Sequence, residues 1–124
     1  MYSHLETIIV VVVFPYKEAF EVYFYYDFST VPCIMIPEDV KVIEYESFAG
    51  CGFSNVVIPT SCIEIQERAF ADTNSVLRIL IPSSVTSIAK NAFENCHSVI
   101  IYSDENCYAQ QYATENQLHF VLNN

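Results

Sequence analysis

Three prolines that recur at a nearly fixed interval constrain the fold more than any other feature of this chain. Pro37, Pro59 and Pro82 are 22 and 23 residues apart. Four more columns keep the same register: Val40, Cys62 and Val85; Ile43, Ile65 and Ile88; Phe48, Phe70 and Phe93; Cys51, Thr73 and Cys96. This agreement over three successive copies indicates a repeat protein with a period near 22 to 23 residues.

Each unit begins with an apolar stretch that a proline closes, at residues 34–37, 56–59 and 79–82. Proline has no N–H group to donate to a sheet, so the proline column marks where the strand pairing stops in every turn. A polar corner, a second extended segment and a return segment with the phenylalanine follow. Because no single unit can bury its apolar side chains, stacked units must share one continuous core. Alternation along the first strand predicts these inward residues: Ile34, Ile36, Val56, Ile58, Ile79 and Ile81.

The chain reads as a single domain over residues 1–124, in which three clear repeats occupy residues 31–100. Residues 7–30 are rich in β-forming residues but lose the repeat register after Pro15, and we interpret them as a degenerate first turn. We expect residues 101–124 to form a C-terminal cap, because a solenoid must cover its last open core.

The predicted cap contains one helix and one strand. Ser103 and Asp104 are residue types that cap helices, and the following segment from Glu105 to Asn116 has helical character. The apolar stretch from Leu118 to Leu122 is then a final short strand.

The clearest repeat, IPSSVTSIAKNAFENCHSV at residues 81–99, resembles the BspA-like leucine-rich repeat, whose unit runs roughly CxxLxxIxIPxSVTxIGxxAFxxC. The resemblance covers Val31 to about Tyr102, and the pairs Tyr108-Ala109 and Tyr112-Ala113 are similar to the tail that closes many such proteins. It implies the α/β leucine-rich-repeat class: a right-handed, β-rich, single-chain solenoid of short parallel strands with a helix–strand cap.

The resemblance further implies a surface or secreted protein-interaction module, often linked to adhesion, with no catalytic residues and no cofactor. The sequence departs from the pattern where the family has a glycine, after the isoleucine of the second extended segment. Here this position is occupied by Glu44, Gln66 and Ala89, so it cannot require a backbone conformation open only to glycine.

Charge and hydropathy exclude several classes of partner. The net charge is −10, and the five Lys and Arg residues are scattered rather than clustered, which disfavours nucleic acid and anionic membranes. The longest apolar run, residues 8–14, is too short to span a membrane. Residues 1–7 lack the basic flank of a secretory signal, so a buried strand is the better interpretation of this run, and the sequence leaves a cytoplasmic location open.

The cysteines and carboxylates favour packing over chemistry. None of the five cysteines lies in a CxxC pair, so no zinc motif is present. Cys51 and Cys96 are two turns apart, about 10 Å in a stacked sheet, which exceeds the roughly 7 Å Cα separation of a disulfide. We therefore predict five reduced thiols, and we interpret Cys96 beside His97 as a packed residue rather than a nucleophile.

Two acidic pairs, Glu38-Asp39 and Asp104-Glu105, are compatible with cation binding but are also ordinary at turns and helix starts. We predict no metal site.

One row of residues has a candidate function. Between the inward residues of each first strand lies one outward residue, and Met35, Val57 and Leu80 are all apolar. Such a row either reflects β-propensity alone or marks a contact surface. The resemblance places this strand on the concave sheet face of the solenoid. With the neighbouring outward Asn55 and Arg78, these residues form our predicted binding site on that face for a protein partner, with a host or matrix protein as one candidate. Alternatively, the apolar N-terminal region covers this row.

Two other hypotheses remain open at this stage. The chain is alternatively a structural C-terminal segment of a longer solenoid, without a binding site of its own. An enzyme is disfavoured, because no set of polar groups converges in the pattern.

Overall fold

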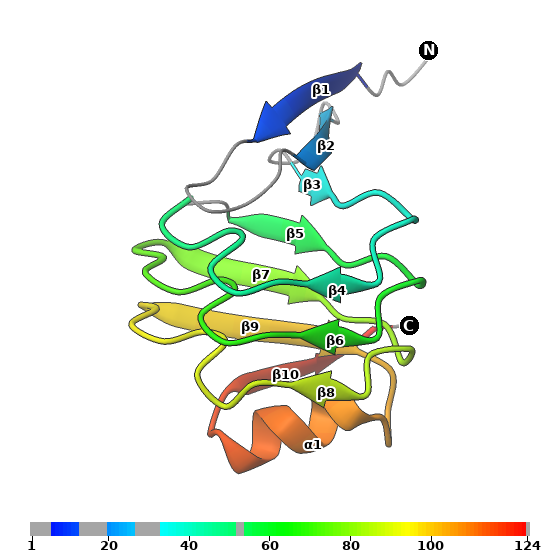
Figure 1. The fold of residues 1–124 in the computed structure, drawn as a ribbon. Coiled ribbons are helices and arrows are strands. Elements are labelled where there is room, and N and C mark those ends of the chain that lie inside the picture. Colours follow the sequence, from blue (N-terminus) through cyan, green and yellow to red (C-terminus); the bar gives the residue numbers. More distant parts are fainter. Residues whose placement is uncertain (1–5, 13–19, 27–32, 52–53, 124) are drawn as a thin grey trace.

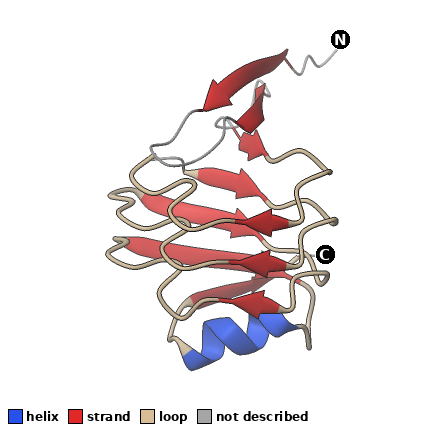
Figure 2. Ribbon diagram, in the orientation of Figure 1, coloured by secondary structure: helices blue, strands red, loops and turns tan. Residues whose placement is uncertain are grey.

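The computed structural model describes residues 6–12, 20–26, 33–51 and 54–123, with side chains described from Met35 onward. These residues form a stack of coiled turns that one helix closes at the C-terminal end (Figure 1). This is the parallel-strand solenoid with a C-terminal helix that the resemblance implied. Every full turn contributes one strand to each of two sheets, which Figure 2 shows as two sets of strands stacked along the same axis.

The larger sheet has seven described strands in the order β1-β2-β3-β5-β7-β9-β10, and the smaller has three in the order β4-β6-β8. The strands of the larger sheet are β1 (Glu6–Val12), β2 (Phe20–Tyr26), β3 (Cys33–Met35), β5 (Asn55–Val57), β7 (Val76–Leu80), β9 (Ser98–Ser103) and β10 (His119–Leu122). Those of the smaller sheet are β4 (Val42–Ile43), β6 (Glu64–Ile65) and β8 (Ser87–Ile88), and the helix is α1 (Tyr108–Glu115).

Strand pairing places the repeat columns side by side. Strands β3, β5, β7, β9 and β10 are parallel to one another, as are β4, β6 and β8. Val56 pairs with Ile79, and Ile79 pairs with Ile101, so equivalent residues of successive turns are neighbours. Residues that lie one repeat period apart in the sequence are therefore neighbours on adjacent strands of the same sheet.

The proline column ends the pairing, as predicted. In each turn the isoleucine just before the proline donates the last hydrogen bond of the first strand, from Ile58 to the Leu80 carbonyl at 2.9 Å and from Ile81 to the Tyr102 carbonyl at 2.9 Å. The proline carbonyl then accepts from the residue three positions later, as in the 3.0 Å bond from Cys62 to Pro59. The corner thus forms where the backbone lacks an N–H donor.

The core is a single column of apolar layers between the two sheets. Ile36, Val56, Ile58, Ile79 and Ile81 are buried as predicted, whereas the side chain of Ile34 lies outside the described part. Phe48, Phe70 and Phe93 form the predicted buried aromatic column, with successive ring centroids 5.4 and 5.8 Å apart and nearly parallel planes.

The expected first turn at residues 7–30 differs from the rest of the stack in strand direction. It contains β1 and β2, which are antiparallel to each other, and β2 is antiparallel to β3. A solenoid turn would present parallel strands, so this region joins the larger sheet as an antiparallel extension. The physical reason is that a short connection between adjacent strands reverses the backbone, while a parallel neighbour needs a crossover.

The helix of the C-terminal cap begins later in the sequence than predicted. We expected a helix from Glu105 with Ser103 or Asp104 as its cap, but α1 begins at Tyr108 after the N-cap residue Cys107, whose side chain makes no capping hydrogen bond. Ser103 is unavailable because it is the buried last residue of β9, and its hydroxyl donates to the Ile81 carbonyl. Turn residues, with Asn106 at a φ of 61°, separate β9 from α1.

Helix α1 replaces the next turn of the solenoid. The single proton of the Tyr112 hydroxyl is shared between the backbone carbonyls of Ala89 and Lys90, whose oxygens lie 2.8 and 3.1 Å from the hydroxyl oxygen. The Tyr112 ring also follows Phe93 in the aromatic column, with centroids 6.2 Å apart. The tyrosine ring therefore covers the end of the aromatic column, and its hydroxyl is hydrogen-bonded to the backbone of the last turn.

Candidate functional site

The outer face of the larger sheet carries the predicted binding residues. Met35 pairs with Val57, and Val57 pairs with Leu80, so their side chains form one row across three strands. Met35 is 37% exposed, and Val57 and Leu80 are half-buried. The inward Val56 and Ile79, one position earlier in β5 and β7, are buried, which confirms the alternation from which we assigned the faces.

This row extends beyond the three residues that the sequence predicted. Tyr102 pairs with Leu80, and Val121 pairs with Tyr102, and both side chains are half-buried on the same face. Tyr102 follows Leu80 by one repeat period, so continuing the column would have found it. Val121 has no such signal, because only the pairing of β10 with β9 brings it into the row.

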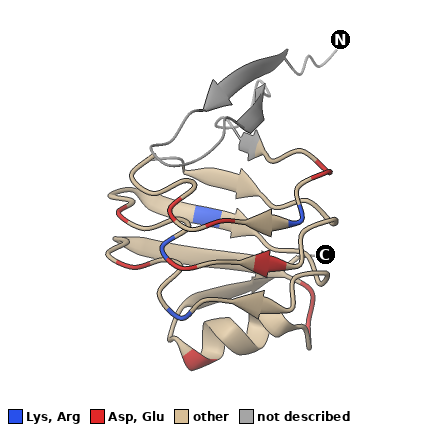
Figure 3. Cartoon of the chain, in the orientation of Figure 1, with Lys and Arg blue, Asp and Glu red and all other residues tan. Residues whose placement is uncertain are grey.

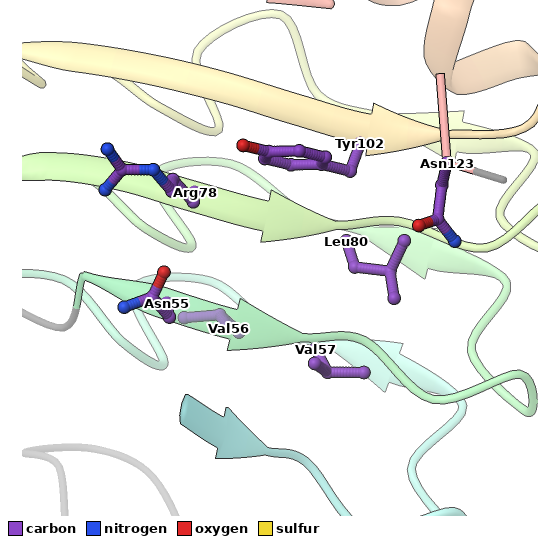
Figure 4. A pocket seen from close by; sticks show the side chains of 7 residues that line it. All are labelled: Asn55, Val56, Val57, Arg78, Leu80, Tyr102 and Asn123. Carbon is purple, nitrogen blue, oxygen red and sulfur yellow. The ribbon is translucent and has the colours of Figure 1, made fainter. Parts of the chain in front are cut away.

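A second row lies two residues earlier along the same strands. Asn55 pairs with Arg78, and Arg78 pairs with Ile100, so Arg78 stands between a polar and an apolar neighbour. Figure 4 shows Asn55, Arg78 and Tyr102 on this face with Leu80 and Val57. Together with Asn123 they line a shallow hollow of about 290 Å³. The structure thus brings four of the five predicted residues around one depression, and Met35 lies one strand away.

The charged side chains lie mainly elsewhere. Figure 3 shows acidic residues along the loops and on β6, whereas β7 carries a basic residue, Arg78. Three ion pairs among the described residues share Arg68, whose guanidinium lies 2.8 Å from Glu46, 2.8 Å from Asp72 and 3.3 Å from Glu94. The guanidinium of Arg68 is therefore already paired with carboxylates of its own turn and of the turns on both sides.

This network changes the acidity of its members. The hydrogen bond to Glu46 is the main cause that raises the pKa of Arg68. The hydrogen bond from Asn95, 2.9 Å from the Asp72 carboxylate, and then the nearby Arg68 lower the pKa of Asp72. Asp72 and Asn95 have φ angles of 62° and 60°, and they follow Gly50, at 72°, in one repeat column. The network thus connects the left-handed positions of successive turns.

The described cysteines form no disulfide and pack in or against the apolar core. Cys51, Cys62, Cys96 and Cys107 are all free, as predicted, while the side chain of Cys33 lies outside the described part. Burial raises the pKa of Cys51 to about 11 and also raises the pKa of Cys62. The Cys96 thiol donates to the Phe70 carbonyl at 3.1 Å, which fits the packing interpretation. The raised pKa keeps the Cys51 and Cys62 thiols protonated at neutral pH, and a protonated thiol is a poor nucleophile.

Potential metal ligands are dispersed over the described stack. Among the residues from 33 to 51 and from 54 to 123, and the two N-terminal strands, no group of three or more His, Cys, Asp or Glu side chains is arranged to hold a metal ion. The same described part contains no helix with the length and apolar character needed to cross a bilayer.

The parallel strands, the two sheets and the terminal cap define a solenoid built from short repeats. The BspA type leucine rich repeat region matches residues 18–117 in six copies. The protein therefore belongs to the BspA-type leucine-rich repeat family, over a longer segment than the resemblance of single motifs had covered. No curated protein and no solved structure matches it.

Proposed function

We propose that this protein is a non-enzymatic protein-interaction module that binds its partner through the outer face of the larger sheet. The observation that carries the proposal is the apolar row of Met35, Val57 and Leu80, continued by Tyr102. In the described part of the molecule, no other helix or strand packs on this face. An apolar row that stays accessible to solvent is typical of a contact surface.

The family supports this proposal at a coarser level. Leucine-rich repeat domains generally mediate protein interactions, and BspA-type proteins are typically surface-associated. We extend this to the present protein as an adhesion-type role at the cell surface or outside the cell, with a host or matrix protein as the candidate partner. Asn55 and Arg78 then supply polar contacts beside the apolar row.

The proposal can be tested with one substitution and one matched control. The purified protein is first screened against a panel of matrix and cell-surface proteins, and the partner it retains is measured with Val57→Lys and Ile63→Lys. Ile63 is an apolar residue that is 51% exposed next to β6, away from the proposed face. Both variants add the same charge, so only the position differs.

We expect Val57→Lys to weaken binding by about fivefold or more, because truncating or charging a central contact costs at least roughly 1 kcal/mol. Ile63→Lys should leave binding unchanged, and both variants should unfold at nearly the wild-type temperature, since such surface changes usually alter stability by less than about 0.5 kcal/mol. Unchanged affinity of Val57→Lys would remove this face as the site. A large loss of its thermal stability would show that Val57 is covered in the folded protein.

A further inference from the structure

The outer face of the larger sheet differs in charge from the rest of this acidic protein. The sequence carries 15 Asp and Glu residues against 5 Lys and Arg residues. Yet the outward side chains described from Met35 in β3 to Val121 in β10 include no Asp or Glu and one cation, Arg78. Figure 3 shows a basic residue on β7, whereas the acidic residues lie on loops, on β6 and on α1.

Arg78 is exposed and has no carboxylate partner among the described residues, in contrast to Arg68 with its three. It lies at the rim of the hollow that Val57, Leu80 and Tyr102 also line. A guanidinium presents a planar fork of donors that matches a carboxylate in two parallel hydrogen bonds. Apolar neighbours exclude water, and this strengthens such a contact relative to one on an open surface.

The geometry points to a partner of definite chemistry: we infer that this face binds an extended peptide segment that presents one carboxylate to Arg78 and an apolar side chain to Leu80. The inference rests on the proposed function and specifies its partner. Arg78 and Leu80 are two residues apart in β7, and their side chains lie on the same face. They therefore have the spacing of about 6.6–6.8 Å that also separates side chains i and i+2 of an extended segment.

The matching partner sequence is an acidic residue and an apolar residue separated by one position, lying along β7. Val57 and Tyr102, which pair with Leu80 from the two neighbouring strands, widen the apolar contact on both sides. The free C-terminus of a polypeptide offers the same carboxylate chemistry as an Asp or Glu side chain, so both sources are included in the test.

The test uses defined peptides and the whole protein. The first probe is a fluorescein-labelled, end-blocked peptide of alternating Thr and Leu with one central Glu in a Leu position. The second replaces Glu with Gln, and the third is the Gln peptide shortened to end in a free carboxylate at that residue. Anisotropy titrations are run with wild type, Arg78→Gln, Val57→Lys and Lys41→Gln. Lys41 serves as the control because it is an exposed cation next to β4, on the other sheet. Circular dichroism checks that each variant is folded.

We expect the Glu peptide or the free-carboxylate peptide to bind wild type about tenfold more tightly than the blocked Gln peptide, the gain typical of a charge-assisted hydrogen bond. This advantage should disappear in Arg78→Gln and persist in Lys41→Gln. Which of the two acidic peptides binds more tightly identifies the source of the carboxylate.

Three results would overturn the inference. Equal binding of the Glu and Gln peptides, with both lost in Val57→Lys, would leave the interaction face in place without a carboxylate site. If Lys41→Gln and Arg78→Gln weakened the binding of the acidic peptides equally, the preference for a carboxylate would depend on the net charge of the protein and not on a site at Arg78. No measurable binding of any peptide would reject an extended acidic partner, whereas the proposed function is judged separately by the Val57→Lys test on the retained protein.

Discussion

The central phenylalanine of the aromatic column offers the most direct test of how the turns are held together. Phe70 is 2% exposed, and its ring lies between Phe48 and Phe93 with centroid distances of 5.4 and 5.8 Å and interplanar angles of 8° and 12°. Backbone hydrogen bonds fix the turns on both sides, from Phe48 to the Ala69 carbonyl at 2.8 Å and from Phe70 to the Ala92 carbonyl at 2.9 Å. The neighbouring turns therefore cannot move together to fill the cavity that truncation of Phe70 would leave.

The expected loss of stability in Phe70→Ala follows from these contacts. Burying an aromatic side chain of this size contributes about 1.5–3 kcal/mol, and each of the two ring contacts adds about 0.5–1.5 kcal/mol. Phe→Ala substitutions in protein cores typically cost about 3–5 kcal/mol, which lies within the sum of these contributions. We expect Phe70→Ala to lower the free energy of unfolding by this amount.

Urea denaturation followed by circular dichroism measures the change, and Phe70→Leu serves as the matched control. Leucine keeps most of the apolar volume but removes both ring contacts, so the control should lose only about 1–2 kcal/mol. A loss below about 1 kcal/mol in Phe70→Ala, at an unchanged urea dependence, would refute the central core position. Equal losses in the two variants would instead show that ring stacking accounts for the whole effect.

Three further predictions concern the thiols and the cap. Cys51 and Cys96 should remain unmodified by iodoacetamide at neutral pH until the protein unfolds, and a mass shift corresponding to a bridge between them would contradict the stacking. Burial raises the pKa of Cys51 from 9.0 to about 11 on folding, so its contribution to stability is complete below pH 9 and is lost as the pH rises to about 11. In urea titrations at several pH values, wild type should therefore lose more stability than Cys51→Ala between pH 9 and 11. Tyr112→Phe should cost about 0.5–1.5 kcal/mol of unfolding free energy, since it removes the hydroxyl that donates to the Ala89 and Lys90 carbonyls but keeps the ring beside Phe93. No loss at all would show that water replaces this hydrogen bond.

The predicted binding residues show which outward side chains can be predicted from the inward–outward alternation along a strand. The sequence indicated that Val57 and Leu80 face away from the core, and the burial of Val56 and Ile79 confirms it. The same reasoning did not reach Val121, because no proline or repeat spacing relates β10 to the earlier strands. It also could not show that Arg68 is bound to three carboxylates while Arg78 is exposed, since this depends on which loops of successive turns become neighbours.

The two ends of the stack depend most on tertiary structure. Residue types around Ser103 suggested a helix cap, but burial of this serine at the end of β9 assigns its hydroxyl to the Ile81 carbonyl and delays the helix to Tyr108. Likewise, β-forming residues predicted strands before residue 30 but not their direction, which the antiparallel pairing of β1 with β2 and of β2 with β3 decides.

The sequence by itself determined the repeat period, the inward columns and the corners of each turn. It could do so because every turn repeats the same contacts one strand further along, so that a spatial relation becomes a fixed spacing in the sequence. Pro59, Phe70 and Ile81 occupy their places for this reason. Only the tertiary structure decided the strand direction at one end, the tyrosine contacts at the other and the place of Val121 on the outer face, because these contacts occur once and have no period to reveal them.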